Sequence, residues 1–359
     1  MADVLIIGGG IVGLLSALSH TDRGRRVTLV DAPASHPPAS WAGGGILAPL
    51  FAWRYPDAMN RLTADGPARY RELVSRLAGY AGLRHDDLCD SGLWVEATGA
   101  ERESALDWAR DWRQRCEPRA LADAWPAAED RDGVWFPEVG NIRNPRLLKA
   151  LRARLADQGV RRVEDRAVAV EPEGRGATVV LAGGERLAAP SVLISAGAWS
   201  PSLLAPLGVS VPLFPAKGEM LLYRLAPGQV PSIVLTENGY LIPRADGAVL
   251  AGSTLKEGDA STEPTEEGRR RLEAMAASIL PALADLPPEH HWAGVRPGCG
   301  RDWPYLGEVP GTHGVFAAVG HHRNGLVSAP ASAEFLVQLM NGETPFLDPA
   351  DYSLGPSSS

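Results

Sequence analysis

Two arginines in the last quarter of the chain stand where a fixed positive charge could do chemistry. Arg296 lies at an expected strand turn, in Trp-Ala-Gly-Val-Arg-Pro-Gly, and Arg323 lies in a glycine-bounded turn between an apolar run and an expected helix. A guanidinium binds a carboxylate through two parallel hydrogen bonds and stays charged at any relevant pH. Tyr240, which begins an expected strand, would add a phenolic hydroxyl. Together these three groups would suit a small carboxylic acid.

The same residues also have a purely structural interpretation. Each arginine could close its turn by donating to backbone carbonyls, and Tyr240 could be a core residue, which its spacing favours. His321 and His322 could touch a bound ring or could satisfy a loop. Spacing alone does not separate these alternatives.

A second chemical feature lies at the amino terminus. An apolar run at 4–7, typical of a buried strand, leads directly into Gly8-Gly9-Gly10-Ile11-Val12-Gly13, which fits G-x-G-x-x-G. Apolar residues at helical spacing follow, and a second short strand at 27–30 ends in Asp31. This order of strand, glycine turn, helix, strand and acid indicates a dinucleotide site.

Each residue type in this turn has a physical reason. Gly8 permits a tight turn, Gly10 lets a pyrophosphate approach the backbone, and Gly13 lets the helix pack closely on the strand. Unpaired N–H groups at the helix N-terminus favour phosphate. Asp31 follows at about the 20-residue interval at which a carboxylate binds the ribose hydroxyls. A glycine-rich turn that binds nothing is the alternative, and the combination argues against it.

Two further stretches suit close approach of a ligand to the backbone. Ser40-Trp41-Ala42-Gly43-Gly44-Gly45-Ile46-Leu47 follows a proline-rich loop at 33–38 and holds three consecutive glycines. Ser195-Ala196-Gly197-Ala198-Trp199-Ser200 comes directly after an apolar strand. An enzyme that binds only NAD has no obvious need of the first stretch, and a flexible surface loop is its alternative reading.

The remaining elements must position these residues. Between 212 and 253 short apolar runs alternate with turn residues, which predicts an antiparallel meander. The long helix at 104–116 carries Trp108 and Trp112, which we expect to pack in the core. The expected helices are 54–80, 104–116, 146–155, 265–280 and 326–340, and the expected strands are 92–95, 160–170, 177–181, 192–194, 219–223, 233–236, 240–243, 248–251 and 315–319.

Composition restricts the class of protein. A chain of 359 residues predicts two domains, and a net charge of −8 argues against nucleic acid or an anionic membrane as partner. Cys89, Cys116 and Cys299 are odd in number and widely spaced, so we expect no disulfide framework and no zinc site, and we expect a cytoplasmic location. The histidines form no metal-ligand spacing. No apolar run is long enough to span a membrane, and Asp3 with the glycines excludes a signal peptide.

Taken in order, the motifs resemble the FAD-dependent D-amino-acid oxidase superfamily. The resemblance rests on the glycine turn with Asp31, the loop at 40–47, Ser-Ala-Gly-Ala-Trp-Ser, Lys217-Gly218-Glu219, Tyr-Leu-Ile-Pro-Arg, Trp-Ala-Gly-Val-Arg-Pro-Gly and Gly-His-His-Arg-Asn-Gly-Leu. It covers Val4 to about Met340. Within the superfamily the order is most similar to the bacterial glycine oxidases that serve thiamine synthesis.

The resemblance implies a set of site residues. Arg296 and Arg323 would hold the substrate carboxylate with Tyr240 beside it, and Cys299 does not fall in the motif that attaches FAD covalently in some relatives, so non-covalent FAD is implied. His322 and Cys299 depart from common residues near the expected pocket, and substrate preference stays open. The residues assigned to FAD are Gly8, Gly10, Ile11, Val12, Gly13, Asp31, Ala32, Ser40, Gly44, Gly45, Ile46, Val168, Gly197, His321, His322, Arg323, Asn324, Gly325 and Leu326.

The expected fold is α/β, an FAD-binding Rossmann-like doubly wound domain with an inserted antiparallel-sheet substrate domain. We expect the FAD domain at 1–50, 141–205 and 295–345, the substrate domain at 51–140 and 206–294, and a C-terminal tail at 346–359 that is disordered from about 355.

The implied reaction converts glycine, and possibly sarcosine or small D-amino acids, to the 2-oxo acid, ammonia and hydrogen peroxide by hydride transfer to flavin. Molecular oxygen would be the second substrate, and the family suggests a homo-oligomer. A broader D-amino-acid oxidase, a dehydrogenase with another electron acceptor, a NAD-dependent dehydrogenase and a nucleotide-binding regulatory module are the alternatives.

Overall fold

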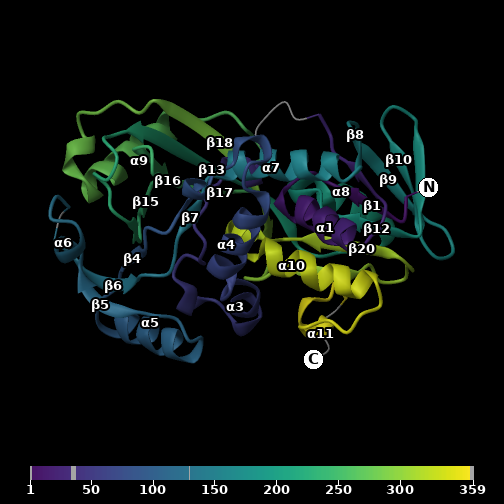
Figure 1. Ribbon diagram of the computed structural model, residues 1–359, viewed down its shortest axis with the longest axis horizontal. Coiled ribbons are helices and arrows are strands. Elements are labelled where there is room, and N and C mark those ends of the chain that lie inside the picture. The colour runs from purple at the N-terminus through teal and green to yellow at the C-terminus, as the bar shows by residue number, and fades with distance from the viewer. Residues whose placement is uncertain (1, 34–37, 129, 356–359) are drawn as a thin grey trace.

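A parallel sheet carries the amino-terminal turn in the computed structural model, which describes residues 2–33, 38–128 and 130–355. Its strands are β1 (Val4–Ile7), β2 (Val27–Val30), β8 (Arg161–Val163), β12 (Ser191–Ile194), β19 (Tyr305–Glu308) and β20 (Val315–Val319). They lie in the order β19-β20-β12-β1-β2-β8, parallel except for β19. Strand β1 therefore lies between β12 and β2, which brings together the ends of three distant segments (Figure 1).

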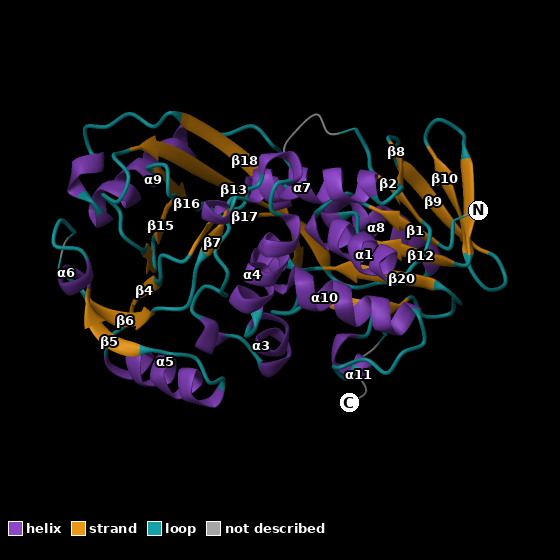
Figure 2. Ribbon diagram, in the orientation of Figure 1, coloured by secondary structure: helices purple, strands orange, loops and turns teal. Residues whose placement is uncertain are grey.

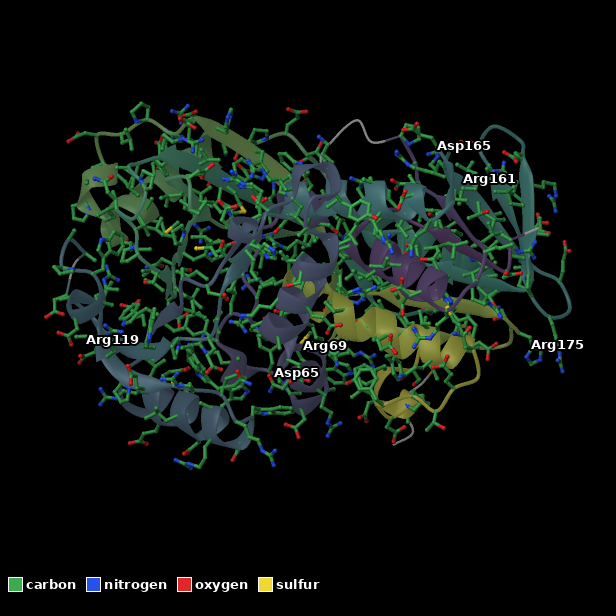
Figure 3. The ribbon with its side chains drawn as sticks, in the orientation of Figure 1. Asp65, Arg69, Arg119, Arg161, Asp165 and Arg175 are labelled. Carbon is green, nitrogen blue, oxygen red and sulfur yellow. The ribbon has the colours of Figure 1, made fainter. Side chains whose placement is uncertain are left out.

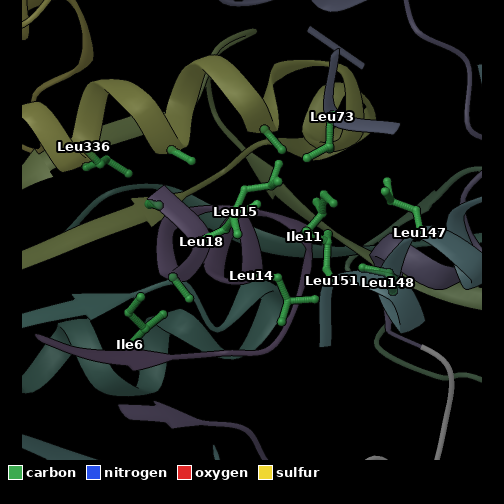
Figure 4. Packing of buried hydrophobic residues seen from close by; sticks show 14 of the residues in the cluster. Ile6, Ile11, Leu14, Leu15, Leu18, Leu73, Leu147, Leu148, Leu151 and Leu336 are labelled. Atoms are coloured by element: carbon green, nitrogen blue, oxygen red, sulfur yellow. The ribbon is translucent and has the colours of Figure 1, made fainter. Parts of the chain in front are cut away.

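Helices cover one face of this sheet. They are α1 (Ile11–Asp22), α7 (Asn144–Asp157) and α10 (Gly325–Met340). Leu14 and Leu18 of α1 are buried with Ile6 of β1, Leu151 of α7 and Leu336 of α10 in one cluster (Figure 4). The central strands β1, β2 and β12 are buried along their whole length and mostly apolar because both faces of the sheet are covered.

The other face is covered by a second, smaller sheet. It consists of the antiparallel strands β9 (Ala167–Pro172), β10 (Ala177–Leu181) and β11 (Arg186–Ala189). Val170 and Val179 of this sheet are buried with Leu5, Ile7 and the residues of short helix α8 (Ser200–Leu204). The α/β class expected from the sequence is confirmed, with a small sheet rather than long helices on this face (Figure 2).

A nine-stranded sheet forms the other half of the molecule. Its strands are β4 (Leu93–Glu96), β5 (Glu117–Ala120), β6 (Asp132–Phe136), β13 (Leu213–Arg224), β14 (Ile233–Thr236), β15 (Gly239–Pro243), β16 (Ala248–Gly252), β17 (Lys256–Glu257) and β18 (His290–Cys299). The strands β14, β15 and β16 form the predicted meander, and β14 also pairs with β4 in parallel.

This sheet has two different faces. Helix α9 (Glu266–Ile279) packs on one of them through Leu272 and Ile279. Tyr240 and Ile242 lie on the other face in a cluster with Ile46, where helix α5 (Gly99–Asp111) also packs. The second face is therefore the one turned toward the loop at 40–47.

The other elements of the described chain are short or connecting. They are α2 (Ala39–Ala42), α3 (Asp57–Thr63), α4 (Gly66–Leu77), α6 (Leu121–Ala124), α11 (Pro349–Tyr352), β3 (Leu88–Cys89) and β7 (Asn141–Ile142). Charged side chains lie around the outside of both halves, with Arg119 at one end and Arg161 and Arg175 at the other (Figure 3). Among the described residues, no helix is long and apolar enough to cross a membrane.

Three expected elements were wrong in their bounds. The strand predicted at 160–170 is two strands in different sheets, because the Asp165 carboxylate accepts from the N–H groups of Arg166 (2.7 Å) and Gly183 (2.9 Å) and turns the chain. The helix predicted at 54–80 is broken between α3 and α4, where Pro67 cannot donate a helical hydrogen bond.

The third correction concerns the helix predicted at 104–116. It begins at Gly99 and ends at Asp111, and Arg113 then has φ of 54°, a left-handed conformation that terminates a helix. Trp108 packs edge-on against Phe136 at 6.0 Å between ring centroids, as expected of a core residue, while Trp112 lies just after the helix.

Near the C-terminus, Tyr352 of α11 is fully buried and its hydroxyl donates to the carbonyl of Ala58 at 2.8 Å. The expected disorder at 355–359 and most of the proline-rich loop at 33–38 fall on residues 356–359 and 34–37, outside the described residues.

Candidate active site

The turn after β1 presents free backbone N–H groups at the start of α1. The N–H of Gly8 donates to Val30 O at 2.8 Å, but those of Gly10, Val12 and Gly13 donate to nothing among the residues that the structure describes. The Ser40 hydroxyl, from α2, accepts from the N–H of Ile11 at 3.0 Å. An anion at this helix terminus would therefore find unpaired donors and the positive end of the helix dipole.

The three motif glycines are needed for different physical reasons. A Cβ on Gly8 would lie 2.4 Å from Ser195 O, and one on Gly13 would lie 2.0 Å from Gly8 O, so the folded chain itself requires both. A Cβ on Gly10 would meet only the Ser40 hydroxyl, at 3.3 Å. Internal packing therefore does not explain Gly10, whereas a group bound against the turn does.

Asp31 is held in the position expected of a ribose ligand. Its Oδ1 accepts from the N–H of Gly9 at 2.8 Å, and its Oδ2 lies 3.7 Å from the guanidinium of Arg162. Ala32 follows it and is exposed. The glycine turn and the acid at the end of β2 are thus joined by a direct hydrogen bond.

The loop at 43–46 forms a second set of free donors. Gly45 has φ of +84°, and a Cβ on it would lie 2.1 Å from Ile142 O. Ile46 forms a bridge with Asn141, which fixes the loop against β7. In the described part of the chain the N–H groups of Gly44, Gly45 and Ile46 make no hydrogen bond, although the carbonyls of Gly43, Gly44 and Gly45 each accept one.

Val168 and Gly197 lie on different elements of the fold. Gly197 follows β12 with φ of +61°, close to Gly8 through Ser195. Val168 lies on the edge strand β9 and is 45% exposed, at a register shift that leaves it without a partner in β10. Its backbone is thus free of regular pairing, as backbone recognition of a base would need.

The segment 321–326 leads from β20 into α10. His321 is buried with its Nε2 at 3.3 Å from Ser332 Oγ, and burial lowers its pKa to about 4. His322 has φ of 47°, and its buried Nε2 has no partner among the described residues. Burial, and then Arg323 and Arg296, lower the pKa of His322 to about 4. Asn324 is buried, and Gly325 and Leu326 begin α10.

The structure brings Arg296, Arg323 and Tyr240 together. Burial lowers the pKa of Arg296, the neighbouring Tyr240 opposes this, and the charge of Arg323 adds to it. Arg323 is exposed and makes no hydrogen bond or ion pair within 2–33, 38–128 and 130–355. The two positive charges are therefore close enough to affect each other, and no carboxylate of the described residues forms an ion pair with either.

The chain supports Arg296 with groups that were not predicted as site residues. Its Nη2 donates to Ser253 Oγ at 2.8 Å and its Nη1 to Thr254 O at 3.3 Å. A Cβ on Gly218 would lie 2.0 Å from Arg296 Nη1, so this glycine makes room for the guanidinium. Strand alternation could have revealed Gly218. Lys217 and Glu219 are buried on one side of β13, so Gly218 between them lies on the other side, where Arg296 packs.

Arg244 was also missed. Its Nη2 donates to the carbonyl of Gly44 at 2.9 Å, and its Nη1 donates to Asn141 Oδ1. It closes the Tyr-Leu-Ile-Pro-Arg motif, in which only Tyr240 was assigned a role. Period-two alternation from Tyr240 would have placed Arg244 on the same face.

Cys299 is turned inward. Its thiol donates to Gly320 O at 2.9 Å and to Arg301 O at 2.8 Å, and burial raises its pKa. No cluster of three or more His, Cys, Asp and Glu side chains suited to a metal ion occurs in the described residues.

The residues present fit a flavin dinucleotide. The free N–H groups at the α1 terminus suit the pyrophosphate and Asp31 suits the ribose. The free N–H groups at 44–46 lie beside Tyr240, since a Cβ on Gly44 would be 3.4 Å from Tyr240 Cε2. A NAD-only site would not require the second set of donors.

Comparisons with known proteins agree with this geometry. The chain is 40% identical to the glycine oxidase of Pseudomonas aeruginosa, with 98% of each chain covered, and 38% identical to that of Pseudomonas putida, also with 98% of each covered. The crystal structure of glycine oxidase from Geobacillus kaustophilus superposes with a TM-score of 0.92 at 26% identity, covering 99% of this chain and 98% of that one. The sequence model of the family described as FAD dependent oxidoreductase (DAO) matches residues 3–339. This chain therefore belongs to the DAO family of FAD-dependent oxidoreductases.

Proposed function

We propose that this protein is a glycine oxidase, an FAD-dependent amino-acid oxidase that converts glycine to glyoxylate, ammonia and hydrogen peroxide. The observation that carries the proposal is the arrangement of Arg296, Arg323 and Tyr240 beside the Gly44–Ile46 loop. The similarity to glycine oxidases over almost the whole chain supports the choice of substrate. Sarcosine and small D-amino acids share the same carboxylate and amine and are candidate further substrates.

The two arginines would bind and orient the substrate carboxylate. A guanidinium has five N–H donors, and Arg296 donates to Ser253 and Thr254 with Tyr240 beside it, so donors remain for a bidentate contact. Arg323 has no competing partner among the described residues. His322, uncharged at neutral pH, does not add a third charge. Fixing the carboxylate would point the α-carbon in one direction.

FAD, when bound, would supply the redox chemistry, as acceptor of the α-hydrogen as hydride and as the group that oxygen would reoxidise. We assign its pyrophosphate to the turn from Gly8 to Gly13 with Ser40, its ribose to Asp31 and Ala32, and its adenine to the backbone of Val168. We assign its ring system to Gly44, Gly45, Ile46, Gly197 and the segment from His321 to Leu326. The free N–H groups and the absence of an internal reason for Gly10 support these assignments.

The domain division predicted from the sequence follows the two large sheets. We infer an FAD domain at 1–50, 141–205 and 295–345 and a substrate domain at 51–140 and 206–294. The strand order supports this division except at 295–299, because β18 continues the nine-stranded sheet to Cys299. Oxygen as electron acceptor, a cytoplasmic location, a homo-oligomer and a role in thiamine synthesis stay predictions.

A spectral titration tests the proposal. The purified protein should be yellow, anaerobic glycine should bleach the flavin absorbance, and air should restore it with release of one hydrogen peroxide per flavin. Colourless protein that does not take up FAD would refute the assignment. Bleaching by glycine without peroxide on admission of air would indicate a dehydrogenase.

A further inference from the structure

Arg244 is a buried guanidinium whose hydrogen bonds go to neutral groups. It is 8% exposed, and its bonds go to the Gly44 carbonyl and the Asn141 amide oxygen. The acids nearest to it are paired elsewhere: Asp246 with Arg143 at 2.8 Å, and Asp87 with Arg146 at 2.7 Å. A positive charge therefore sits in the interior directly behind the Gly44–Ile46 loop.

The charge persists although burial opposes it. Burial, and then the charge of Arg143, lower the pKa of Arg244 to about 10, which leaves the side chain protonated at neutral pH. Burying an unpaired charge is costly, and a neutral residue could fill the same volume. A neutral donor could also bind these two oxygens, so the two hydrogen bonds alone do not explain why the buried side chain is charged.

The bond to Gly44 acts on a peptide unit that also carries a backbone donor. The Gly44 carbonyl and the Gly45 N–H belong to one peptide unit, and the N–H makes no hydrogen bond among the described residues. A charged donor on the carbonyl polarises the peptide and strengthens its N–H as a donor. An acceptor bound to the Gly45 N–H would therefore form a stronger hydrogen bond.

The same strand connects this loop to the substrate groups. Tyr240 and Ile242 are two residues apart on β15, so their side chains lie on one face, and Arg244 directly follows Pro243, the last residue of that strand. A Cβ on Gly44 would lie 2.5 Å from Ile242 Cδ1 and 3.4 Å from Tyr240 Cε2. Arg244 therefore clamps the loop onto the strand that also carries Tyr240.

We propose that Arg244 is a positioning residue with two effects: it fixes the Gly44–Ile46 loop relative to Tyr240, and it polarises the Gly44–Gly45 peptide toward the flavin ring, which stabilises the reduced flavin. The inference rests on the proposed function, because it takes this loop to line the flavin. Reduced flavin carries more negative charge than oxidised flavin, so a stronger donor favours the reduced form.

Four variants of the holoenzyme test the two effects separately. Arg244→Met removes the bond and the charge, and Arg244→Lys keeps the charge but not the fork. Asn141→Asp keeps an acceptor for Arg244 and places a negative charge beside its guanidinium. Arg143→Lys is the matched control, since it removes a guanidinium from the same corner, keeps a cation beside Asp246 and does not touch the loop.

The readouts are the two-electron flavin potential, the dissociation constant of FAD from the apoprotein, and KM for glycine. In Arg244→Met the reduced flavin should bind about tenfold more weakly relative to oxidised flavin, which is a fall of about 30 mV. Its KM for glycine should rise severalfold because Tyr240 loses its fixed distance to the loop. Arg244→Lys should recover part of the potential but not KM, and Arg143→Lys should resemble the unchanged protein.

Asn141→Asp keeps the proposal testable if Arg244→Met does not fold. It should lower the potential while the FAD dissociation constant changes less than threefold. An unchanged potential in both Arg244→Met and Asn141→Asp would overturn the polarising effect, and an unchanged KM in Arg244→Met would overturn the positioning effect. Failure of the proposed function is separate, since it would show as colourless or glycine-inert protein before any substitution.

Discussion

At the residue scale, the candidate site depends on how Arg296 is supported. The guanidinium lies over Gly218 and donates to Ser253 and Thr254, and both Tyr240 and Arg323 affect its pKa. None of these neighbours is close to Arg296 in sequence. The strand pairing of β13 and β18 and the return of the chain at 253–254 bring them together.

Replacing Arg296 should separate substrate binding from cofactor binding. In Arg296→Met we expect KM for glycine to rise roughly 100-fold, since a hydrogen-bonded charge pair contributes up to about 3 kcal/mol. FAD should remain bound, as Arg296 belongs to the substrate sheet. Steady-state kinetics and the visible spectrum measure the two effects, and Arg296→Lys, which keeps the charge, is the matched control. Loss of flavin from Arg296→Met would contradict the assignment.

Gly218→Ala offers an independent check on the same guanidinium. A methyl group there would lie 2.0 Å from Arg296 Nη1 and must displace it. We expect KM for glycine to rise roughly tenfold, because the arginine keeps its charge but loses its geometry. The FAD spectrum should not change. Unchanged kinetics would mean that the guanidinium position does not matter for binding.

At the element scale, the turn between β1 and α1 combines two kinds of constraint. Gly8 and Gly13 are required because backbone atoms of the protein occupy the space of a Cβ. Gly10 has an ordinary conformation, with φ of −75°, and only the Ser40 hydroxyl nearby. The element therefore contains glycines needed for folding and one that only a ligand explains.

This difference predicts opposite behaviour of two alanine variants. Gly10→Ala should fold as the apoprotein with an unchanged melting temperature but should bind FAD at least tenfold more weakly, because the methyl group stands where the pyrophosphate approaches. Gly13→Ala should destabilise the apoprotein itself by roughly 1–3 kcal/mol through the contact with Gly8 O. Thermal unfolding of the apoproteins and FAD titration distinguish them. Equal destabilisation of both apoproteins would show that Gly10 also serves folding.

At the scale of the whole molecule, buried histidines make stability depend on pH. The pKa values of His20, His321 and His322 are each lowered to about 4, chiefly by burial. A lowered pKa means that the folded protein binds protons less readily than the unfolded chain. Above about pH 6.5 these histidines are uncharged in both states and do not affect stability. As the pH falls from 6.5 toward 4, the unfolded chain takes up protons first, so the free energy of unfolding decreases.

His20 allows this dependence to be measured away from the site. Its ring lies on α1, fully buried, and neither ring nitrogen has a partner in the described structure. His20→Leu should reduce the slope of unfolding free energy against pH by up to about 1.4 kcal/mol per unit between pH 6 and 4.5. At pH 7 the variant should be as stable or about 1 kcal/mol more stable.

Urea unfolding of the holoenzyme at several pH values is the measurement, with the exposed His85→Gln as control. An unchanged slope in His20→Leu would mean that His20 keeps its ordinary proton affinity in the folded protein.

The sequence by itself determined the parts of the site that depend on neighbours along the chain. The order of β1, glycine turn, α1, β2 and Asp31 follows from apolar spacing and from the few residue types that allow such a turn. The α/β class, the meander and the helix after Arg323 were predicted for the same reason. Local patterns also misjudged where elements end, as at Asp165 and Pro67, because single side chains decide those ends.

Only the tertiary structure decided which distant groups meet. Ser40 reaches the α1 terminus from α2, Arg244 reaches Gly44, and Ser253 reaches Arg296, although each pair is far apart in sequence. A spacing rule contains no information on these contacts, because sheet register is set by the burial of whole faces and not by the residues that touch.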